Sequence, residues 1–455
     1  MNDCTSLTDP LLHNTDLGNA RRLVRRYDFR IRYCAPLGGW LLYTEGRWRR
    51  DESLKIEALA KDVVQELHAE AAQANSEAER SHLRKHALGT ERADRLSAIV
   101  RVAASEPGIA VSADLFDANP WVLNARNGTV DLRTGALLPH RPEDLLSHQA
   151  NASYVPQAPC PWWQWFLHRT FGGDAEMIAY IQRLVGYALT GDMSEQEFYL
   201  LVGTGANGKT VFIEIIMFVL GTYARTMDPN LLVRTRNEQH PTALADLRGA
   251  RFATGNELSA DSWVNEALLK RLVGGDRVTA RRMYQDFFEF SPTAKLLLAV
   301  NTKPSIAGQD HGIWRRIRVL PFEVTIPENE RDKHLLDKLK TEADGILWWA
   351  VLGCLDWQHG GLRTLGKVIE ASNEYRSEMD AVGHFLEDNC ERDANATISF
   401  AMLFDSYENW CEQVSEEPLS KRAFATRLDE LGFPKDRGAG NSAARKGLRR
   451  KVLTF

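Results

Sequence analysis

Residues 199–212 read YLLVGTGANGKTVF, so an apolar run breaks into three glycines, a lysine and a hydroxyl. Within this stretch, residues 203–210 satisfy the pattern G-x-x-x-x-G-K-[ST]. Residues 197–202, which are apolar after Glu197, predict a strand before the loop. One apolar face along 210–220 predicts a helix that Gly221 ends. This order of strand, glycine-rich loop and helix constrains the chain to an α/β fold with a phosphate-binding loop.

The loop residues fit ATP with Mg²⁺. Glycines let the loop fold tightly enough for backbone N–H groups to point at phosphate oxygens, and the positive end of the following helix favours an anion. Lys209 is expected to meet the β and γ phosphates, and Thr210 to offer its hydroxyl to Mg²⁺. The expected ATP-binding residues are Gly203, Thr204, Gly205, Ala206, Asn207, Gly208, Lys209, Thr210 and Val211. The alternative is a glycine-rich turn with a structural role.

Two later strands end in polar residues suited to hydrolysis. RFATGNE ends in Glu257, which is predicted to hold Mg²⁺ or polarise the attacking water. KLLLAVN ends in Asn301, which is predicted to orient water against the γ phosphate. The alternatives are a solvated acid at a strand end for Glu257 and a turn-forming asparagine before Pro304 for Asn301.

Residues 312–322, GIWRRIRVLPF, place Arg315 and Arg316 just before a further strand. A guanidinium group is planar and always charged. Either arginine is therefore suited to stabilising the charge that develops during phosphoryl transfer.

Strand-like and helical segments alternate through the middle of the chain. The expected strands are residues 197–202, 250–254, 296–300 and 319–322, and the expected helices include residues 162–190, 210–220 and 265–272. This alternation is typical of a parallel sheet with helices packed against it. Residues 155–161, VPQAPCP, are proline-rich and predict a boundary before this part.

The flanking regions have a different character. Residues 40–48 and 127–140 predict hairpins, and residues 52–105 predict helices, which together indicate an N-terminal α+β unit. After about residue 380, short helices at 400–414 and 420–431 precede a glycine-rich basic tail. The pattern fits a winged-helix module or a helical cap on the main domain.

Both ends of the chain are basic, although the formal net charge is -5. The N-terminal set is Arg21, Arg22, Arg25, Arg26, Arg30, Arg32, Arg47, Arg49 and Arg50, and the C-terminal set is Lys435, Arg437, Arg445, Lys446, Arg449, Arg450 and Lys451. Each set fits either a surface that tracks a polyanion or an ordinary solvated face.

Composition limits the other classes of protein. With 455 residues, 44% hydrophobic and 26% charged, the chain has an ordinary globular composition. Its longest apolar segment, residues 211–220, is interrupted by Glu214, so we expect no membrane partner. The N-terminus lacks a secretory pattern. The six cysteines are scattered and are expected to be reduced, buried thiols of a cytoplasmic protein.

The segments GTGANGKT, RFATGNE, LLLAVN and GIWRRIRVLPF, in this order, resemble those of superfamily 3 helicases. The chain is similar to the phage and plasmid primase-helicase family related to poxvirus primase-helicases, over most of residues 120–330. This resemblance implies a P-loop NTPase core related to the AAA+ fold, assembled as a hexameric ring. It also implies ATP hydrolysis between subunits and translocation on single-stranded DNA, usually from 3' to 5'.

The resemblance assigns further roles to arginines. In the family an arginine finger reaches the nucleotide of the neighbouring subunit, for which Arg316 is our first choice and Arg315 the second. Many members of the superfamily carry two acids at the end of the second motif strand, whereas here Glu257 alone must do the work of the pair.

A hairpin in residues 272–290 corresponds to the one that lines the central channel in the family. This implies DNA contacts by Arg281, Arg282 and Tyr284, because guanidinium groups pair with phosphates and aromatic rings stack on bases. The alternative is an ordinary exposed hairpin. The packing residues of this segment are expected to be Phe287, Phe288 and Phe290.

Larger relatives join the helicase to an N-terminal primase. Residues 1–150 show no paired acidic strand and no cysteine-histidine zinc cluster. We therefore predict an accessory N-terminal domain, with a separate primase or polymerase as a partner.

The predicted protein is an ATP-dependent, ring-forming helicase that replicates phage or mobile-element DNA in a bacterial cytosol and acts on single-stranded and forked DNA. The predicted domains are residues 1–155 for accessory or oligomerisation roles, 156–345 for the ATPase, 346–380 for a helical connector and 381–455 for a winged-helix-like DNA-binding module. The rival interpretations are a P-loop ATPase that loads or remodels replication proteins and a non-enzymatic origin-binding scaffold.

Overall fold

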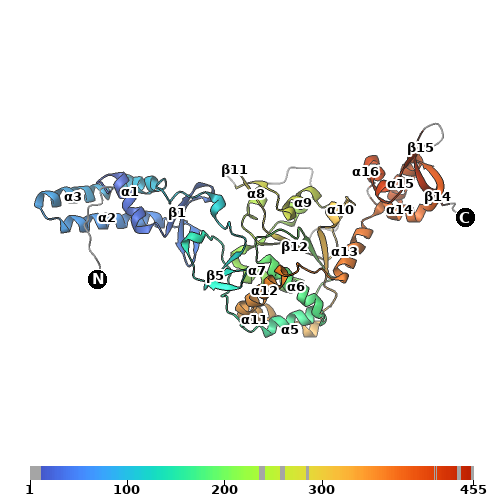
Figure 1. Cartoon of the computed structure of the whole chain (residues 1–455), viewed down its shortest axis with the longest axis horizontal. Helices are drawn as coiled ribbons and strands as arrows, with labels where there is room; N and C mark the ends of the chain where they lie inside the picture. Colours follow the sequence, from blue (N-terminus) through green and yellow to red (C-terminus); the bar gives the residue numbers. More distant parts are fainter. Residues whose placement is uncertain are drawn as a thin grey trace.

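The computed structural model describes residues 12–234, 241–256, 262–282, 286–414, 416, 418–437 and 442–451. Figure 1 shows an elongated molecule with a helical arm at the N-terminal end, a central α/β unit and a small unit at the C-terminal end.

A five-stranded parallel sheet forms the centre of the molecule. Its strands are β7 (Phe198–Val202), β8 (Ala224–Thr226), β9 (Phe252–Asn256), β12 (Lys295–Val300) and β13 (Ile317–Pro321). Their order across the sheet is β13-β7-β12-β9-β8, and each neighbouring pair is parallel. The predicted parallel α/β sheet is confirmed. The order places β12 between β7, which leads into the phosphate loop, and β9.

Helices cover both faces of this sheet. Tyr199 and Leu201 point into one core, whereas Phe198 and Leu200 point into the other, as the two-residue period of a strand requires. The first core is closed by α5 (Pro161–Thr170), α6 (Ala175–Ala188), α7 (Lys209–Leu220), α11 (Leu335–Thr341) and α12 (Ala343–Gln358). The second is closed by α8 (Pro241–Ala245), α9 (Glu266–Gly274), α10 (His311–Trp314) and α13 (Gly366–Glu378).

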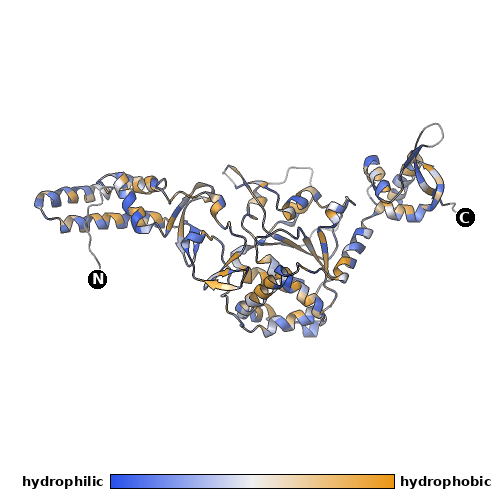
Figure 2. Cartoon of the chain, in the orientation of Figure 1, coloured by the Kyte–Doolittle hydropathy of each residue, from blue (hydrophilic) through white to orange (hydrophobic). Residues whose placement is uncertain are grey.

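The N-terminal unit combines helices with a small antiparallel sheet. Its elements are α1 (Asp16–Tyr27), β1 (Ile31–Cys34), β2 (Gly39–Thr44), β3 (Arg47–Arg50), α2 (Lys55–Gln73), α3 (Glu77–Thr90) and α4 (Ala93–Ala103). Helices α2 and α3 pack side by side as the arm, and both alternate between polar and apolar residues along their length (Figures 1 and 2). The α+β character predicted for this region is confirmed.

A second small sheet links the N-terminal unit to the centre. It consists of β4 (Val122–Ala125), β5 (Gly128–Asp131) and β6 (Ala136–Leu138), which pair as consecutive hairpins. Leu123, Val130 and Tyr154 belong to the same hydrophobic core as helix α7. The chain therefore enters the central core before the proline-rich segment at 155–161, and the exact domain boundaries stay a prediction.

The C-terminal unit is built on its own core. Its elements are α14 (Ala381–Asn389), β14 (Cys390–Ser399), α15 (Phe400–Val414), α16 (Lys421–Glu430), β15 (Lys435–Arg437) and β16 (Ala443–Arg450). The strands form an antiparallel sheet in the order β14-β16-β15. Phe385, Tyr407 and Phe424 meet at its centre, with Tyr407 and Phe424 stacked 4.6 Å apart. Gly432, with φ of 86°, follows α16.

The structure tests the predictions about the cysteines and about membrane-spanning segments. The five described cysteines are free and buried, as expected, and Cys4 lies outside the described residues. Within the described part of the chain, no helix is long and apolar enough to cross a bilayer.

Part of each basic cluster serves the fold and is not available to a polyanion. Arg22 is buried and pairs with Glu70. Arg445 is buried in the C-terminal unit, where it pairs with Asp429 and donates to the carbonyl of Ala425 at 2.8 Å. Neither arginine therefore lies on a solvated face. The sequence could not predict this, because a cluster of basic residues does not reveal which of its members points inward.

Candidate functional site: a phosphate loop at the carboxyl edge of the sheet

The glycines of the loop are required by close approach and by backbone conformation. A Cβ atom on Gly203 would lie 2.1 Å from Nδ2 of Asn207 and 2.5 Å from the carbonyl oxygen of Phe322. Gly208 has φ of 86°, and a Cβ there would lie 2.9 Å from the hydroxyl of Thr170. The side chain of Asn207 is buried and donates to the same Phe322 carbonyl at 3.2 Å. The loop is thus held against α5 and the end of β13.

Lys209 is the first residue of α7 and is only 6% exposed. Its Nζ donates to the carbonyl of Gly203 at 2.5 Å and lies 3.4 Å from Oδ1 of Asn301. Among the described residues, no carboxylate forms an ion pair with this ammonium group. Burial without a compensating anion lowers the pKa of Lys209.

These features fit a triphosphate. The loop surrounds a space at the N-terminus of a 12-residue helix, and the buried lysine needs an anion beside it. Thr210 lines the same cavity and carries a hydroxyl suited to Mg²⁺. The described residues include no group of three or more His, Cys, Asp or Glu side chains placed to hold a metal.

Asn301 reaches this site because of the strand order. β12 runs parallel to β7 with Val300 opposite Val202, so Asn301 follows its strand at the edge where the loop begins. On the other side, Ala299 of β12 lies opposite Asn256, the last residue of β9. Glu257 follows Asn256 in the sequence, but it lies outside the described residues. Lys209, Thr210 and Asn301 are therefore brought together, and the role of Glu257 stays a prediction.

A cavity of about 840 Å³ opens beside the loop, within the range typical of small-molecule sites. Its lining residues are Trp165, Phe166, Arg169, Gly205, Ala206, Asn207, Gly208, Lys209, Thr210, Val211, Ala299, Asn301, Ile326, Glu330, Arg331, Asp332 and Leu335. The wall formed by α5 and by residues 326–335 was not predicted. Its only sequence signal is the aromatic run WWQWF at 162–166, which by itself also fits a buried helix.

Arg315 and Arg316 lie at the opposite edge of the sheet. The backbone carbonyl of Arg316 accepts from the N–H of Phe198, the first residue of β7, whereas the N–H of Phe322 donates to Val202 at the other end. Four rises of about 3.3 Å along β7 separate these two edges by about 13 Å. The two arginines therefore do not join the loop of their own chain.

The predicted channel hairpin is present as β10 (Val278–Arg281) and β11 (Phe287–Phe290), an antiparallel pair in which Arg281 lies opposite Phe287. Arg282 is exposed, and Tyr284 lies outside the described residues.

The prediction that all three phenylalanines of the hairpin are packing residues is wrong for Phe287. Phe290 is buried and Phe288 is partly buried against the core. Phe287 is 59% exposed, and the guanidinium of Arg281 lies 4.9 Å from its ring centre. Because successive side chains of a strand point to opposite faces, Phe287 lies on the face of β11 opposite to Phe288 and Phe290, and that face is exposed.

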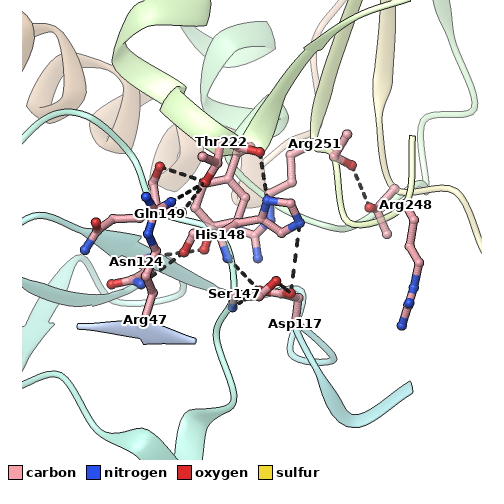
Figure 3. Close-up of polar contacts among 12 residues, drawn as sticks. Arg47, Asp117, Asn124, Ser147, His148, Gln149, Thr222, Arg248 and Arg251 are labelled. Atoms are coloured by element: carbon pink, nitrogen blue, oxygen red, sulfur yellow. Dashed lines mark hydrogen bonds and ion pairs between the residues drawn. The ribbon is translucent and has the colours of Figure 1, made fainter. Parts of the chain in front are cut away.

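The far end of α7 is fixed by a buried polar cluster (Figure 3). Nδ1 of His148 donates to the carbonyl of Thr222 at 2.7 Å, and the N–H of Gln149 donates to the Thr222 hydroxyl at 2.7 Å. Arg47 of β3 donates to the same hydroxyl at 3.1 Å. Burial lowers the pKa of His148, so its ring is neutral at pH 7. The helix that starts at Lys209 is thus anchored at its other end to the N-terminal unit.

Fold and loop together define an α/β protein of the P-loop type. Three family models match parts of the chain. The family described as D5 N terminal like matches residues 20–172, a family of unknown function (DUF5906) matches residues 201–316, and the family described as poxvirus D5 protein-like matches residues 377–440. The chain therefore carries D5-type segments on both sides of its central unit.

Curated relatives come from large DNA viruses. "Putative helicase L207/L206" of Acanthamoeba polyphaga mimivirus is 30% identical over 320 residues, covering 65% of this chain and 33% of that protein. "Putative helicase 184R" of Invertebrate iridescent virus 6 is 24% identical over 356 residues, with 69% and 37% covered. "Putative primase C962R" of African swine fever virus is 30% identical over 231 residues, with 49% and 24% covered. The predicted resemblance to relatives of poxvirus primase-helicases is confirmed. The chain spans between 24% and 37% of the length of these three proteins.

A solved structure has the same overall fold. "The A form apo structure of NrS-1 C terminal region-CTR" matches with a TM-score of 0.53 at 10% identity, covering 95% of this chain and 99% of that chain.

Proposed function

We propose that this chain is an ATP-driven DNA helicase of superfamily 3 type, which forms a ring and moves on single-stranded or forked DNA during replication. The observation that carries the proposal is the division of the ATPase residues between two edges of one sheet. Lys209, Thr210 and Asn301 stand at the carboxyl edge, and Arg315 and Arg316 stand about 13 Å away at the amino edge. The names of the viral relatives support the same function.

In this proposal, the residues of the carboxyl edge bind and orient the nucleotide. Loop N–H groups and Lys209 neutralise phosphate oxygens, and Thr210 holds Mg²⁺, which supplies positive charge to the β and γ phosphates when it is bound. Asn301 orients the attacking water, and Glu257 is proposed to polarise it. Burial disfavours the charged form of Lys209 and lowers its pKa. A bound phosphate would favour the charged form and raise this pKa again.

The residues of the amino edge serve the neighbouring subunit. Rings form when one surface of a subunit meets a different surface of the next, and such head-to-tail contacts can bring the amino edge of one sheet to the carboxyl edge of another. Arg316, with Arg315 as second choice, is then the arginine finger. A hexamer is the proposed ring size. The AAA+ fold is proposed with it, because β12 stands between the loop strand and β9.

The hairpin is the proposed grip on single-stranded DNA. Arg281 and Arg282 offer charge to the backbone, and the exposed ring of Phe287 offers a face to a base. Tyr284 keeps its proposed role in the same contact.

The C-terminal unit is proposed to be a winged-helix module that binds DNA. The order helix, strand, helix, helix, strand, strand supports this proposal, with α16 as the recognition helix and β15 and β16 as the wing. Exposed Lys421 and Arg422 on α16 and Lys446 on β16 give it a basic surface. A separate primase or polymerase is a proposed partner.

The replicated DNA is proposed to be that of a phage or another mobile element. The named relatives come from viruses of eukaryotes, so a bacterial host and its cytosol stay predictions.

Unwinding of a labelled DNA fork with ATP and Mg²⁺ tests the proposal. Lys209→Ala is expected to reduce both hydrolysis and unwinding to the level of a blank without protein, because the phosphates lose their buried cation. Lys61→Ala, which removes an exposed lysine of α2, is the matched control and should leave both rates unchanged. If the unchanged protein hydrolyses ATP without stimulation by single-stranded DNA and does not unwind the fork, the result would favour an ATPase that loads or remodels replication proteins. If the unchanged protein hydrolyses ATP no faster than Glu257→Gln does, the result would favour a non-enzymatic origin-binding scaffold.

A further inference from the structure

The cavity beside the phosphate loop is lined by more than the loop itself. Residues 205–211 and Asn301 form part of its lining. The rest of the lining includes two separate segments, helix α5 and residues 326–335, which none of the sequence motifs includes. If the proposed function is right, a triphosphate lies against the loop, so the other lining residues have to accept whatever is attached to the phosphates.

Helix α5 presents two different faces to this region. Phe166 and Thr170, four residues apart, lie under the loop, where their side chains come within 3.1 Å and 2.9 Å of the Cβ position of Gly208. Trp165 and Arg169, also four residues apart, occupy the adjacent face and line the cavity together with Phe166. The position of α5 under the loop therefore fixes where Trp165 and Arg169 stand relative to the phosphates.

The opposite wall is tied to the same frame. The N–H of Ile326 donates to the carbonyl of Ala206 in the loop at 2.8 Å. Arg169 reaches across to Glu330, with Nη2 at 2.5 Å and Nε at 3.1 Å from Oε2. This ion pair joins α5 to residues 326–335, and both of its side chains line the cavity.

Trp165 is unusual for a tryptophan because its side chain is 45% exposed while it lines a cavity. Tryptophan is highly buried on average, so an uncovered indole face beside a ligand pocket is informative. Trp162, one turn earlier on the same helix, is 42% exposed but does not line the cavity, and Lys338 lies 4.5 Å from its ring centre. The rings of Trp162 and Trp165 contact each other edge-to-face, with their centres 6.1 Å apart, and of the two only Trp165 lines the cavity.

We propose that Trp165 is the platform on which the base of the bound nucleoside triphosphate stacks, with the Arg169–Glu330 ion pair bordering the base. This inference rests on the proposed function and identifies the specificity element of the same site. An aromatic platform recognises the flat face of a base and not its edge. The site is therefore a nucleoside triphosphate site whose affinity depends on the presence of a base, with less dependence on which base it is.

Binding of two probes, ATP and inorganic tripolyphosphate, measured by calorimetry with Mg²⁺ on the full chain, tests this inference. Stacking on an aromatic ring changes affinity by about fivefold to about 150-fold. Trp165→Ala should weaken ATP binding by about tenfold and leave tripolyphosphate binding unchanged, because the second probe has no base. Trp165→Phe should restore much of the loss. Phe29→Ala, which removes an exposed ring from the N-terminal unit, should bind both probes as the unchanged protein does.

Two results would overturn the inference. ATP affinity unchanged in Trp165→Ala would show that no base stacks there, and an equal loss for both probes would show that Trp165 only supports the loop. Neither result touches the proposed function, which fails separately if the unchanged protein binds neither probe, or if Lys209→Ala binds both equally well.

Discussion

The two edges of the central sheet differ in whether their buried charged side chain forms an ion pair. At the carboxyl edge, Lys209 is a buried cation for which no described carboxylate forms an ion pair. At the amino edge, Glu197 is a buried acid that has a partner, because Arg318 lies 2.7 Å away. Arg315, by contrast, is exposed and donates a hydrogen bond to Gln196 at 3.3 Å.

Under the proposed function, this difference means that neither edge is a complete ATPase site by itself. The carboxyl edge is prepared for an incoming anion, and the amino edge satisfies its buried charge internally while it presents an arginine outward. The hairpin also belongs to the amino edge, because it ends at Phe290 shortly before β12 begins at Lys295. In the proposed ring, the edge that faces a neighbouring subunit is thus also the edge that offers contacts to DNA.

The largest expected effect is that of Arg316→Ala. If this guanidinium completes the site of the next subunit, the rate of hydrolysis should fall by about a thousandfold or more. The dissociation constant for ATP should change little, because the loop of each subunit is intact. Steady-state hydrolysis and calorimetry measure the two quantities. Arg315→Ala should have the smaller effect. If both variants hydrolyse ATP at the full rate, the arginines of the amino edge take no part in catalysis.

A change at Glu197 should alter the pH dependence of stability. Burial raises the pKa of Glu197 to about 7, although Arg318 and the hydroxyl of Tyr199 oppose the shift. Because this pKa is higher in the folded state than the ordinary value of 4.5, the folded state holds the proton more tightly and stability falls as pH rises from 4.5 to 7. The loss from this group is roughly 3 kcal/mol.

Glu197→Gln does not titrate, so its melting temperature should decline less over this pH range than that of the unchanged protein. Glu57→Gln, which replaces an exposed acid on α2, should follow the unchanged protein. Parallel pH profiles for all three proteins would mean that Glu197 is ionised throughout, and that the amino edge holds its acid as an ordinary ion pair.

The smallest effect is expected from Phe287→Ala. Loss of one stacking ring should weaken binding of single-stranded DNA by about fivefold or somewhat more, without changing ATP affinity. Fluorescence anisotropy of a labelled oligonucleotide measures the change. Phe29→Ala removes a phenylalanine of similar exposure, 52%, from the N-terminal unit and should bind DNA normally. If both variants bind the oligonucleotide equally well, Phe287 of the hairpin does not contact DNA.

Local patterns predicted the parts of this molecule that local interactions determine. The strand, loop and helix around Lys209 follow from apolar periodicity and from glycine spacing, and the end of α7 at Gly221 follows from a backbone that only glycine adopts readily. The parallel sheet also followed from alternation along the chain.

Other features depend on contacts between distant segments. The strand order that puts Asn301 beside Lys209, and Arg316 at the far edge, is a property of the assembled sheet. Trp165 lies in an aromatic run that fits a core helix equally well, and only its position beside the loop distinguishes it from buried Trp163. Phe287 was wrongly expected to pack. The sequence does not show which face of β11 other segments cover, and Phe287 lies on the exposed face.

Mixing two inactive variants tests the central claim most directly. Lys209→Ala retains its arginines, and the double variant Arg315→Ala with Arg316→Ala retains its loop, so each should be inactive alone. If subunits exchange at random in a head-to-tail ring, about a quarter of the interfaces combine an intact loop with intact arginines. If each site is shared between neighbouring subunits, an equal mixture should regain about that share of the hydrolysis rate. A mixture in which subunits have exchanged but hydrolysis remains at the blank level would contradict a site shared between neighbouring subunits.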